Sequence, residues 1–508
     1  MEWLRGEQLK TVVLIMLVLL SLVLTYLLWY GSPPYEEAQI VFHESVFFEE
    51  PREIFEVIKP ARLVIPVGEQ ENLLIKRGEE NYRVVWDQAK KFLKGDWIEK
   101  RQVNLGDEPD EEPCLALYFE PAFPLKVDDT PSLAGLSKIT HMKIFTDAER
   151  VILIAGEDDL VYEIEEEDFN GLNHLIDPIK MEKVEAIDLE EDDDNEAEAA
   201  ETEGENEIED DRDGDVESEE EVKLDLEEAY LHKVLEVEMV AGDFGEYEIE
   251  PAKNIYIPQG GKEVYSHLQL ECEEISVDDF LEAVFVNRKL ARTIEEPDGT
   301  MIFTDGEKGV RISNYMEYTA PKLEEGIATQ PYDAAVQEAN ELISYYGGWP
   351  EKYYMDEIVR YNGSIIAGGD SYYYARWRSY HRGIPLVGNK AETEMKFNDR
   401  GLYYYQRALF SVAEQTGEKL EIEWNKEILS RAVEFYVEEF PDDNINNDKT
   451  IETLRLEDIF LAYKLEYTED KGFATGYVVW VVKIEGEVIY LSIPDLTPFQ
   501  EEEENEYL

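Results

Sequence analysis

The sequence has few of the residues that build metal centres and disulfide frameworks. Its 508 residues include two cysteines, Cys114 and Cys272, and six histidines. Two cysteines are too few for a disulfide-stapled fold, although they leave open one bridge or two buried thiols. The histidines are His43, His141, His174, His232, His267 and His381. None stands in a pair with metal-ligand spacing, and there is no H-E-x-x-H motif, so we expect no metal site and no cofactor.

Motifs of nucleotide-binding and hydrolytic enzymes are also missing. The sequence has no G-x-S-x-G elbow, and "GEKGV" at 306–310 lacks the spacing of a phosphate-binding loop. Paired carboxylates cannot be singled out, because 117 of the residues are Asp or Glu and any cleft would contain a pair by chance. We therefore predict no catalytic residues and no small-molecule substrate. A membrane-tethered cell-wall enzyme that uses acidic residues is the alternative.

Positive charge is scarce, with 47 Lys and Arg against 117 Asp and Glu. Residues 188–221 hold 21 acids and one Arg, which leaves 96 acids and 46 bases elsewhere. Such an anionic surface repels nucleic acid and anionic lipid, so neither is an expected partner. The tract at 188–221 has almost no apolar residues and is predicted to be a disordered insertion.

Part of this tract has the spacing of a calcium-binding loop. In "EDDRDGDVESEE", Asp211, Asp213, Gly214 and Glu220 stand at loop positions three, five, six and twelve. Position one is Glu209 rather than Asp, and no apolar helix precedes it. Because matches of this kind arise by chance in so acidic a segment, we expect no formed calcium site.

Only one apolar run is long enough to cross a membrane. Thr11 to Tyr30 are twenty uncharged residues, which as a helix span about 30 Å. Trp29 and Tyr30 end the run where a cleaved signal would need small residues, so we predict a retained transmembrane helix at 11–30. Basic residues precede the run and none follows before Arg52, which places residues 1–10 in the cytoplasm. The expected location is the cell membrane, crossed once, with the bulk of the chain extracytoplasmic.

One face of this predicted helix is a candidate partner-binding surface. Its residues are Leu14, Val18, Ser21, Thr25 and Leu28. Ser21 and Thr25 lie four residues apart, a spacing of small residues that lets two membrane helices pack closely. The alternative is that both hydroxyls bond to carbonyls of their own helix.

The rest of the chain alternates helical and strand-like patterns. Helices are predicted at 79–95, at 276–291 with Ser276 as its cap, after Pro331 as far as Gly347–Gly348, and around Ile428–Tyr436. Strand-like runs follow each helix, which is typical of α+β domains with helices packed on antiparallel sheets. We predict three such domains, at 36–170, 171–318 and 319–500. The run "YYYARWRSYHRGIP" at 372–385 suggests either a binding platform for carbohydrate or peptide or, more simply, a half-buried strand.

Three stretches of the sequence resemble the YycH family. They are "WLRGEQLKTVVLIMLVLLSLVLTYLLW", "RTIEEPDGTMIFTDGEKGVRI" and "RSYHRGIPLVG". The resemblance implies a single-pass protein of a Gram-positive bacterium, with three extracytoplasmic α+β domains. It also implies a regulatory role, together with a YycI-like protein, toward the sensor histidine kinase YycG (WalK), which governs cell-wall metabolism. The acidic tract departs from the family pattern, and the sign of the control does not follow from the resemblance.

Overall fold

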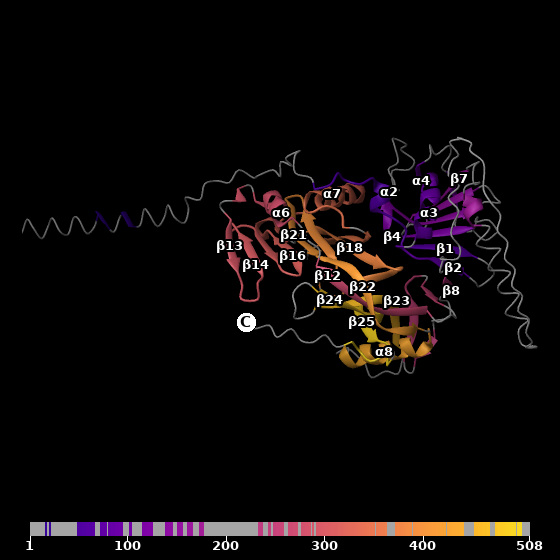
Figure 1. Cartoon of the computed structure of the whole chain (residues 1–508). Helices are drawn as coiled ribbons and strands as arrows, with labels where there is room; N and C mark the ends of the chain where they lie inside the picture. Colours follow the sequence, from indigo (N-terminus) through magenta and orange to yellow (C-terminus); the bar gives the residue numbers. More distant parts are fainter. Residues whose placement is uncertain are drawn as a thin grey trace, which may run out of the picture. The chain divides into compact units, whose positions relative to one another are not determined.

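In the computed structural model the chain divides into two units, Met1–Val46 and Phe47–Leu508, and the sheets with their helices belong to the second, which we call the compact unit (Figure 1). The described residues are 16–17, 20–21, 48–66, 72–78, 80–94, 101–103, 114–124, 138–145, 150–155, 160–165, 172–176, 232–236, 242–244, 247–253, 255–258, 263–272, 276–285, 287–288, 291–350, 352–362, 371–388, 390–422, 424–440, 452–467, 473–493 and 495–499.

The first sheet has nine strands, and every pairing in it is antiparallel. In spatial order they are β11 (Tyr256–Pro258), β8 (His232–Glu236), β2 (Asn72–Ile75), β1 (Arg62–Pro66), β4 (Leu115–Pro124), β5 (Lys138–Phe145), β6 (Arg150–Ala155), β7 (Leu160–Glu165) and β3 (Arg101–Val103). Strands β8 and β11 come from within the predicted central domain of 171–318, yet they pair at the edge of this sheet.

In the described part of the compact unit before residue 180, the helices are α2 (Ile54–Val57), α3 (Glu80–Ala89), α4 (Lys91–Lys94) and a short one at 172–176. Val85 and Trp86 of α3 are buried, and the Trp86 ring packs edge-on against Phe119 of β4 at 5.9 Å. The prediction of one continuous helix at 79–95 was wrong. The helix ends at Ala89, and the Leu93 amide then donates to the carbonyl only three residues back, at Lys90, which tightens the chain into a new turn.

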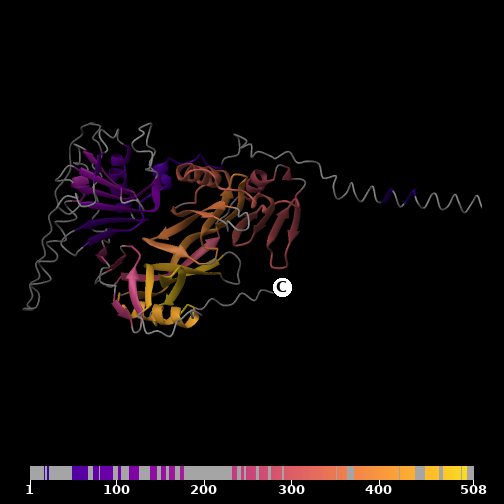
Figure 2. The same cartoon turned by 180° about the vertical axis from the view of Figure 1, so that it is seen from behind.

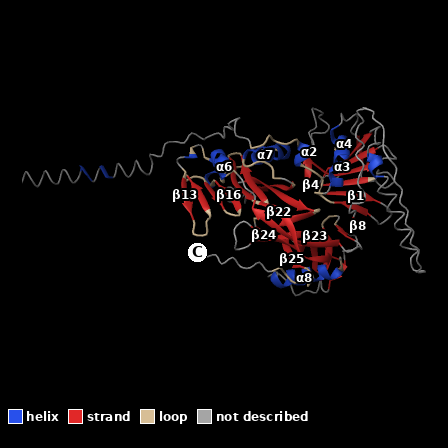
Figure 3. Ribbon diagram, in the orientation of Figure 1, coloured by secondary structure: helices blue, strands red, loops and turns tan. Residues whose placement is uncertain are grey.

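The middle sheet is also antiparallel and carries helices on one face (Figure 3). Its strands are β13 (Arg292–Glu295), β14 (Met301–Thr304), β15 (Gly309–Ile312), β16 (Tyr315–Thr319), β21 (Gly401–Ala408), β20 (Thr393–Asn398), β18 (Ser371–His381) and β17 (Tyr353–Asn362). Its helices are α6 (Val277–Val284), the 3-10 turn η5 (Pro321–Leu323) and α7 (Tyr332–Tyr345). Ser276 caps α6 as predicted, accepting from the Asp279 amide at 3.4 Å. The positive φ of Gly347 (+113°) and Gly348 (+73°) ends α7 where the sequence predicted.

The third sheet holds an extensive apolar core and is covered by α8 (Lys426–Glu439) (Figures 1 and 2). Its strands are β9 (Gly242–Phe244), β10 (Tyr247–Pro251), β12 (Glu263–Cys272), β19 (Ile384–Val387), β22 (Phe410–Ile422), β23 (Glu452–Tyr467), β24 (Phe473–Ile484) and β25 (Glu487–Ser492). Two of its pairings, β10 with β23 and β19 with β23, are parallel rather than antiparallel. The turn from β18 into β19 makes the middle and third sheets one continuous sixteen-stranded sheet.

The mixed α+β fold predicted from the sequence is confirmed, while the division into three domains stays a prediction. Among the described residues no helix is long and apolar enough to span a bilayer. Most of the predicted span at 11–30 lies outside the described residues. Met16, Leu17, Leu20 and Ser21 are described, and they are helical and exposed.

Candidate functional site

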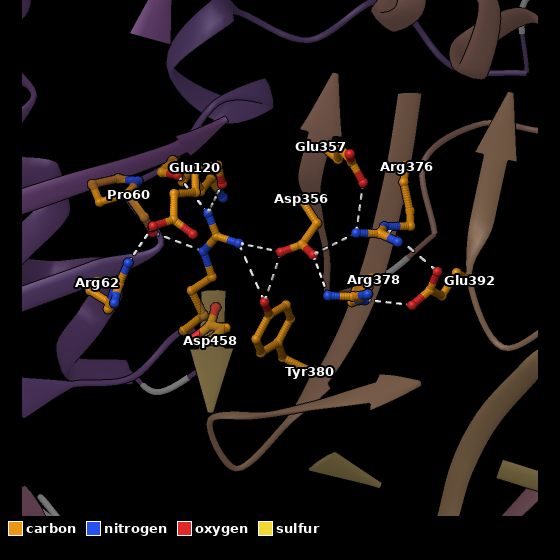
Figure 4. A network of polar contacts seen from close by, with 12 residues as sticks. Pro60, Arg62, Glu120, Asp356, Glu357, Arg376, Arg378, Tyr380, Glu392 and Asp458 are labelled. Atoms are coloured by element: carbon orange, nitrogen blue, oxygen red, sulfur yellow. Dashed lines mark hydrogen bonds and ion pairs between the residues drawn. The ribbon is translucent and has the colours of Figure 1, made fainter. Parts of the chain in front are cut away.

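Charged side chains gather where the first, middle and third sheets meet (Figure 4). Arg77, just after β2, lies at the centre and is 2% exposed. Its guanidinium donates to three backbone carbonyls around the first sheet: Pro60 at 2.8 Å, Lys59 at 2.8 Å and Glu120 at 3.1 Å. These three hydrogen bonds hold the Arg77 side chain against the first sheet without the help of a carboxylate.

The remaining donor of Arg77 reaches across to the middle sheet. Its Nη1 lies 3.3 Å from Oδ1 of Asp356 and 3.4 Å from the Tyr380 hydroxyl. Gly78 follows with φ +86°, and a Cβ there would stand 3.4 Å from Cβ of Tyr380. A glycine at this position allows both the turn and the close approach of the two sheets.

Asp356 projects into the interface because β17 bulges at this residue. The pairing of β17 with β18 shifts register between Met355 and Glu357, which leaves Asp356 as the extra residue. Its carboxylate accepts from Arg378 Nη1 at 2.5 Å and from the Tyr380 hydroxyl at 3.1 Å, in addition to Arg77.

These partners hold Asp356 in its charged form. Burial opposes ionisation, but Arg378, Arg77 and Arg376 together lower the pKa of Asp356 to about 2. Asp356 also raises the pKa of Arg378 against the effect of burial. The carboxylate is therefore ionised near neutral pH, and it acts as a fixed counter-charge rather than a proton donor.

Two further carboxylates, Glu357 and Glu392, extend the cluster along the middle sheet. Arg378 Nε donates to Glu392 at 2.5 Å, and Arg376 lies 2.7 Å from Glu357 and 3.6 Å from the second oxygen of Glu392. Side-chain exposures at Arg378 and Glu392 are 9% and 10%, so the Arg378–Glu392 pair is largely shielded from water.

A second group of charges ties the first sheet to the third. Glu120 of β4 pairs with Arg62 and with Lys253, whose ammonium lies 2.8 Å from Glu120 and 2.9 Å from Asp458 of β23. Although burial favours the neutral acid, Arg62 and Lys253 lower the pKa of Glu120 to about 2. The Glu120 side chain is 40% exposed, so water screens these pairs more than those of Asp356.

We call the whole cluster the ion-pair joint. It comprises Arg62, Arg77, Glu120, Lys253, Asp356, Glu357, Arg376, Arg378, Tyr380, Glu392 and Asp458. Each of its acids pairs with at least one of its bases, as expected of a cluster that holds sheets together. Within the described part of the chain, no group of three or more His, Cys, Asp and Glu is placed to hold a metal ion.

The residues predicted to bind partners are not tested by this arrangement. Of the predicted membrane face, only Ser21 is among the described residues, where it is helical and exposed. Leu14, Val18, Thr25 and Leu28 lie outside them, as do the acidic tract and its calcium-like spacing. The partner-binding face therefore stays a prediction.

Other residues noted in the sequence have ordinary packing roles. The run at 372–385 contains most of β18, whose residues alternate between buried and half-buried from Ser371 to Trp377, as expected for a half-buried strand. His141 packs edge-on against Tyr118 at 4.8 Å, and His267 against Tyr477 at 4.9 Å. Cys114 is buried, and the side chain of Cys272 is not described, so a bridge between them stays open.

One local pattern in the sequence points to the joint. Arg376 and Arg378 stand two apart in a strand of aromatic residues, so both point to one face and need counter-charges there. Asp356, which accepts from Arg378, also accepts from Arg77. Arg77 and Asp356 stand 279 positions apart in the sequence. With acids outnumbering bases about two to one, no pattern in the chain singles out which carboxylate is the counter-charge.

Comparison with known proteins identifies the family that the fold resembles. Residues 7–99 match the family model described as YycH protein, N-terminal domain. The crystal structure of YycH from Bacillus subtilis matches with a TM-score of 0.51 and 12% identity, over 87% of this chain and 98% of that one. An uncharacterized protein from Eubacterium rectale matches with a TM-score of 0.33 and 12% identity, over 49% of this chain and 90% of that one. No curated protein matches the sequence.

One of the two YycH matches rests on the sequence of residues 7–99, and the other rests on a fold that covers 87% of the chain. Residues 7–99 therefore resemble the YycH N-terminal domain and the chain has a fold like that of YycH, which confirms the resemblance to the YycH family predicted from its sequence.

Proposed function

We propose that the protein is a membrane-anchored, extracytoplasmic regulator of a YycG (WalK) sensor kinase, and that it acts by protein–protein contact together with a YycI-like protein. The observation that carries the proposal is the match to YycH, which covers 98% of the Bacillus subtilis chain. A regulator of this kind needs surfaces that bind other proteins and a means of reaching the kinase in the membrane. It needs no catalytic site.

The proposed anchor is the apolar run at 11–30. The family model begins at residue 7 and therefore includes this run within the matched domain. The uncharged length and the Trp29–Tyr30 boundary support a membrane span. The face formed by Leu14, Val18, Ser21, Thr25 and Leu28 is the proposed contact with the spans of the kinase and its companion.

The ion-pair joint supports contact rather than acid–base chemistry. Glu120 and Asp356 are each held ionised by two or more cations, and both have a pKa of about 2. A general acid needs a pKa raised toward neutrality, so neither group suits that role. Because the ion-pair joint connects three sheets, a partner that binds to one sheet can change the position of the others.

Co-purification tests the proposal most simply. The full-length chain, expressed with its cognate YycG-like kinase and YycI-like protein, should recover both from detergent-solubilised membranes. A chain lacking residues 1–30 should recover less of each. A second pair of variants probes the membrane face: Ser21→Leu with Thr25→Leu fills the groove between helices, and Leu19→Ile with Val23→Ile alters the opposite side as a matched control.

The outcomes separate the proposal from its alternative. Loss of kinase recovery in the Ser21–Thr25 variant alone supports recognition through the span. Normal recovery in both variants makes the span a tether and moves recognition to the extracytoplasmic part. Cell-wall hydrolysis by the purified protein would favour the tethered enzyme, and Glu338 would be the acid to replace, because burial and Glu341 raise its pKa to about 7.

A further inference from the structure

The first described stretch of the compact unit is fastened to helix α7. In Figures 1 and 2 the indigo segment that precedes α2 runs alongside α7. We call residues 48–52 the strap. At its start the Phe48 amide donates to the Ser344 carbonyl at 3.2 Å, and at its end the Arg52 guanidinium lies over the Trp349 ring at 4.8 Å. Between them, Glu49 accepts from the Trp349 amide at 3.0 Å.

Asn340 holds the strap by its backbone. The Arg52 amide donates to Asn340 Oδ1 at 3.1 Å, and Asn340 Nδ2 donates to the Arg52 carbonyl at 2.7 Å. The side-chain amide thus pairs with one residue of the strap as a neighbouring β-strand would. The same Oδ1 accepts from the Trp349 indole at 3.1 Å, so it is shared between the strap and a residue that follows α7.

These hydrogen bonds explain why an asparagine stands at this point of the helix. Asn340 is 0% exposed and lies in the middle of α7, where most of the buried residues are apolar. Asparagine is a poor residue for a helix interior, and a buried amide without partners is costly. Its three hydrogen bonds to the strap and Trp349 remove that cost, and two of them exist only while the strap is docked.

The strap itself buries little apolar surface. Glu49, Glu50 and Pro51 are exposed, and Phe48 and Arg52 are half-buried. The strap is held by a few polar contacts rather than by a core, and such contacts add little net stability because water replaces them on release. By contrast, the segment after it is anchored by Val57 and Ile58, which are 1% and 0% exposed.

We propose that the Asn340 contact is a latch, at which the strap docks and is released while the rest of the compact unit stays folded. When the latch is closed, the chain from residue 47 enters the unit beside α7. When it is open, the first fixed point moves to α2, and residues 48–53 provide about 20 Å of free chain. The regulatory meaning rests on the proposed function, since release would loosen the link between the anchor and the body.

The rate of limited proteolysis by trypsin measures how often the latch is open. Arg52 is the first Lys or Arg after Lys10, so cleavage after Arg52 produces one defined fragment from the full-length protein. Its side chain, amide and carbonyl are all engaged while the latch is closed, and a protease needs them free. In Asn340→Leu we expect cleavage after Arg52 to be faster by about tenfold, the factor that two lost hydrogen bonds supply.

A matched variant separates the latch from general stability. Asn398 is 1% exposed and also satisfies backbone groups, those of Leu323 at 2.9 Å and Arg400 at 2.9 Å, but it does not touch the strap. Asn398→Leu should leave cleavage after Arg52 at the wild-type rate relative to other sites. Equal acceleration at Arg52 and at all other sites in Asn340→Leu would overturn the proposal, as would an unchanged rate with an intact fold.

A reversible lock provides the second arm of the test. A Cβ built on Gly348 lies 3.5 Å from Cβ of Phe48, within the range of about 3.5–4.5 Å seen in disulfides. In Phe48→Cys with Gly348→Cys, oxidation should slow cleavage after Arg52 and reduction should restore it. Both states carry the same strain at Gly348, whose φ is +73°. The single variant Phe48→Cys should show no dependence on redox state, and a double variant equally insensitive would contradict the latch.

Discussion

The ion-pair joint and the Asn340 latch both fasten distant parts of the chain, but they use opposite chemistry. The joint places full charges at an interface, with Asp356 contacted by two arginines and a tyrosine. The latch uses one neutral amide that holds a backbone segment. A buried charge that loses its partner is far more costly than a neutral group that can turn to water. The joint therefore suits a permanent connection and the latch a releasable one.

The difference also reflects what each connection joins. Arg77 and Asp356 connect two sheets, each of which has its own apolar core. Separation of the two sheets would expose both charges to water. The strap is a short extended segment with exposed acidic residues, and it loses little by leaving α7. Variants at the two sites should accordingly differ in the size of their effect and in how far it spreads through the molecule.

The largest effect should follow from removing the central carboxylate of the joint. Asp356→Ala leaves the buried Arg77 without its carboxylate partner and Arg378 with Glu392 alone, and we expect a loss of about 3–5 kcal/mol in the free energy of unfolding. Urea unfolding of the full chain measures it. A loss below about 1 kcal/mol, the scale of a surface pair, would show that the joint is not a structural fastening.

Acid should remove part of the stability that the joint provides. The pKa of Asp356 is about 2 in the folded protein against 3.8 for the free group. A lowered pKa stabilises the fold above pH 3.8, and the contribution of about 2 kcal/mol is lost as the pH falls toward 2. The stability gap between wild type and Asp356→Asn should therefore be constant from pH 7 to about 5 and should narrow below that. A gap that stays constant to pH 2.5 would mean that Asp356 is not held ionised.

The latch should contribute less to global stability than the joint. Asn340→Leu removes three hydrogen bonds but leaves the groups of the strap free to bond with water, so we expect a loss of about 1–2 kcal/mol. The same urea experiment measures it, with Asn398→Leu as the buried control. A loss as large as that of Asp356→Ala would make Asn340 part of the permanent core and not a latch.

The smallest effect should come from an ion pair that water surrounds. Arg431 and Glu434 pair at 2.9 Å on α8 with side-chain exposures of 53% and 61%. Glu434→Ala should change the free energy of unfolding by less than about 0.5 kcal/mol. Comparison with Asp356→Ala shows how much of the effect at the joint comes from burial and multiple partners, because the two pairs have the same chemistry.

Features that depend on neighbours in sequence could be predicted. The cap at Ser276, the end of α7 at Gly347–Gly348 and the half-buried pattern of β18 follow from spacing and local conformation. The break at Lys90 did not, because the residues on both sides favour a helix and only a tight turn in the folded chain interrupts it. Local preference therefore gives the type of element more reliably than its ends.

Features that depend on distant partners could not be predicted. Arg52 and Asn340 are 288 positions apart, and nothing in either local sequence specifies the other. The same holds for the assignment of β8 and β11 to the first sheet and for the parallel pairing of β10 with β23. In each case the choice among many chemically equal partners is made by the packing of whole sheets.

We expect the compact unit to open at the strap and to stay closed at the ion-pair joint. Native-state hydrogen exchange of the full-length protein at increasing urea tests it directly, because local opening is insensitive to denaturant and global unfolding is not. The Arg52 and Trp349 amides should exchange by a low-energy opening that urea does not change. The amides of β17 and β18 around Asp356 should exchange only through urea-sensitive global unfolding. Equal opening free energies and equal urea dependence at the two places would contradict it.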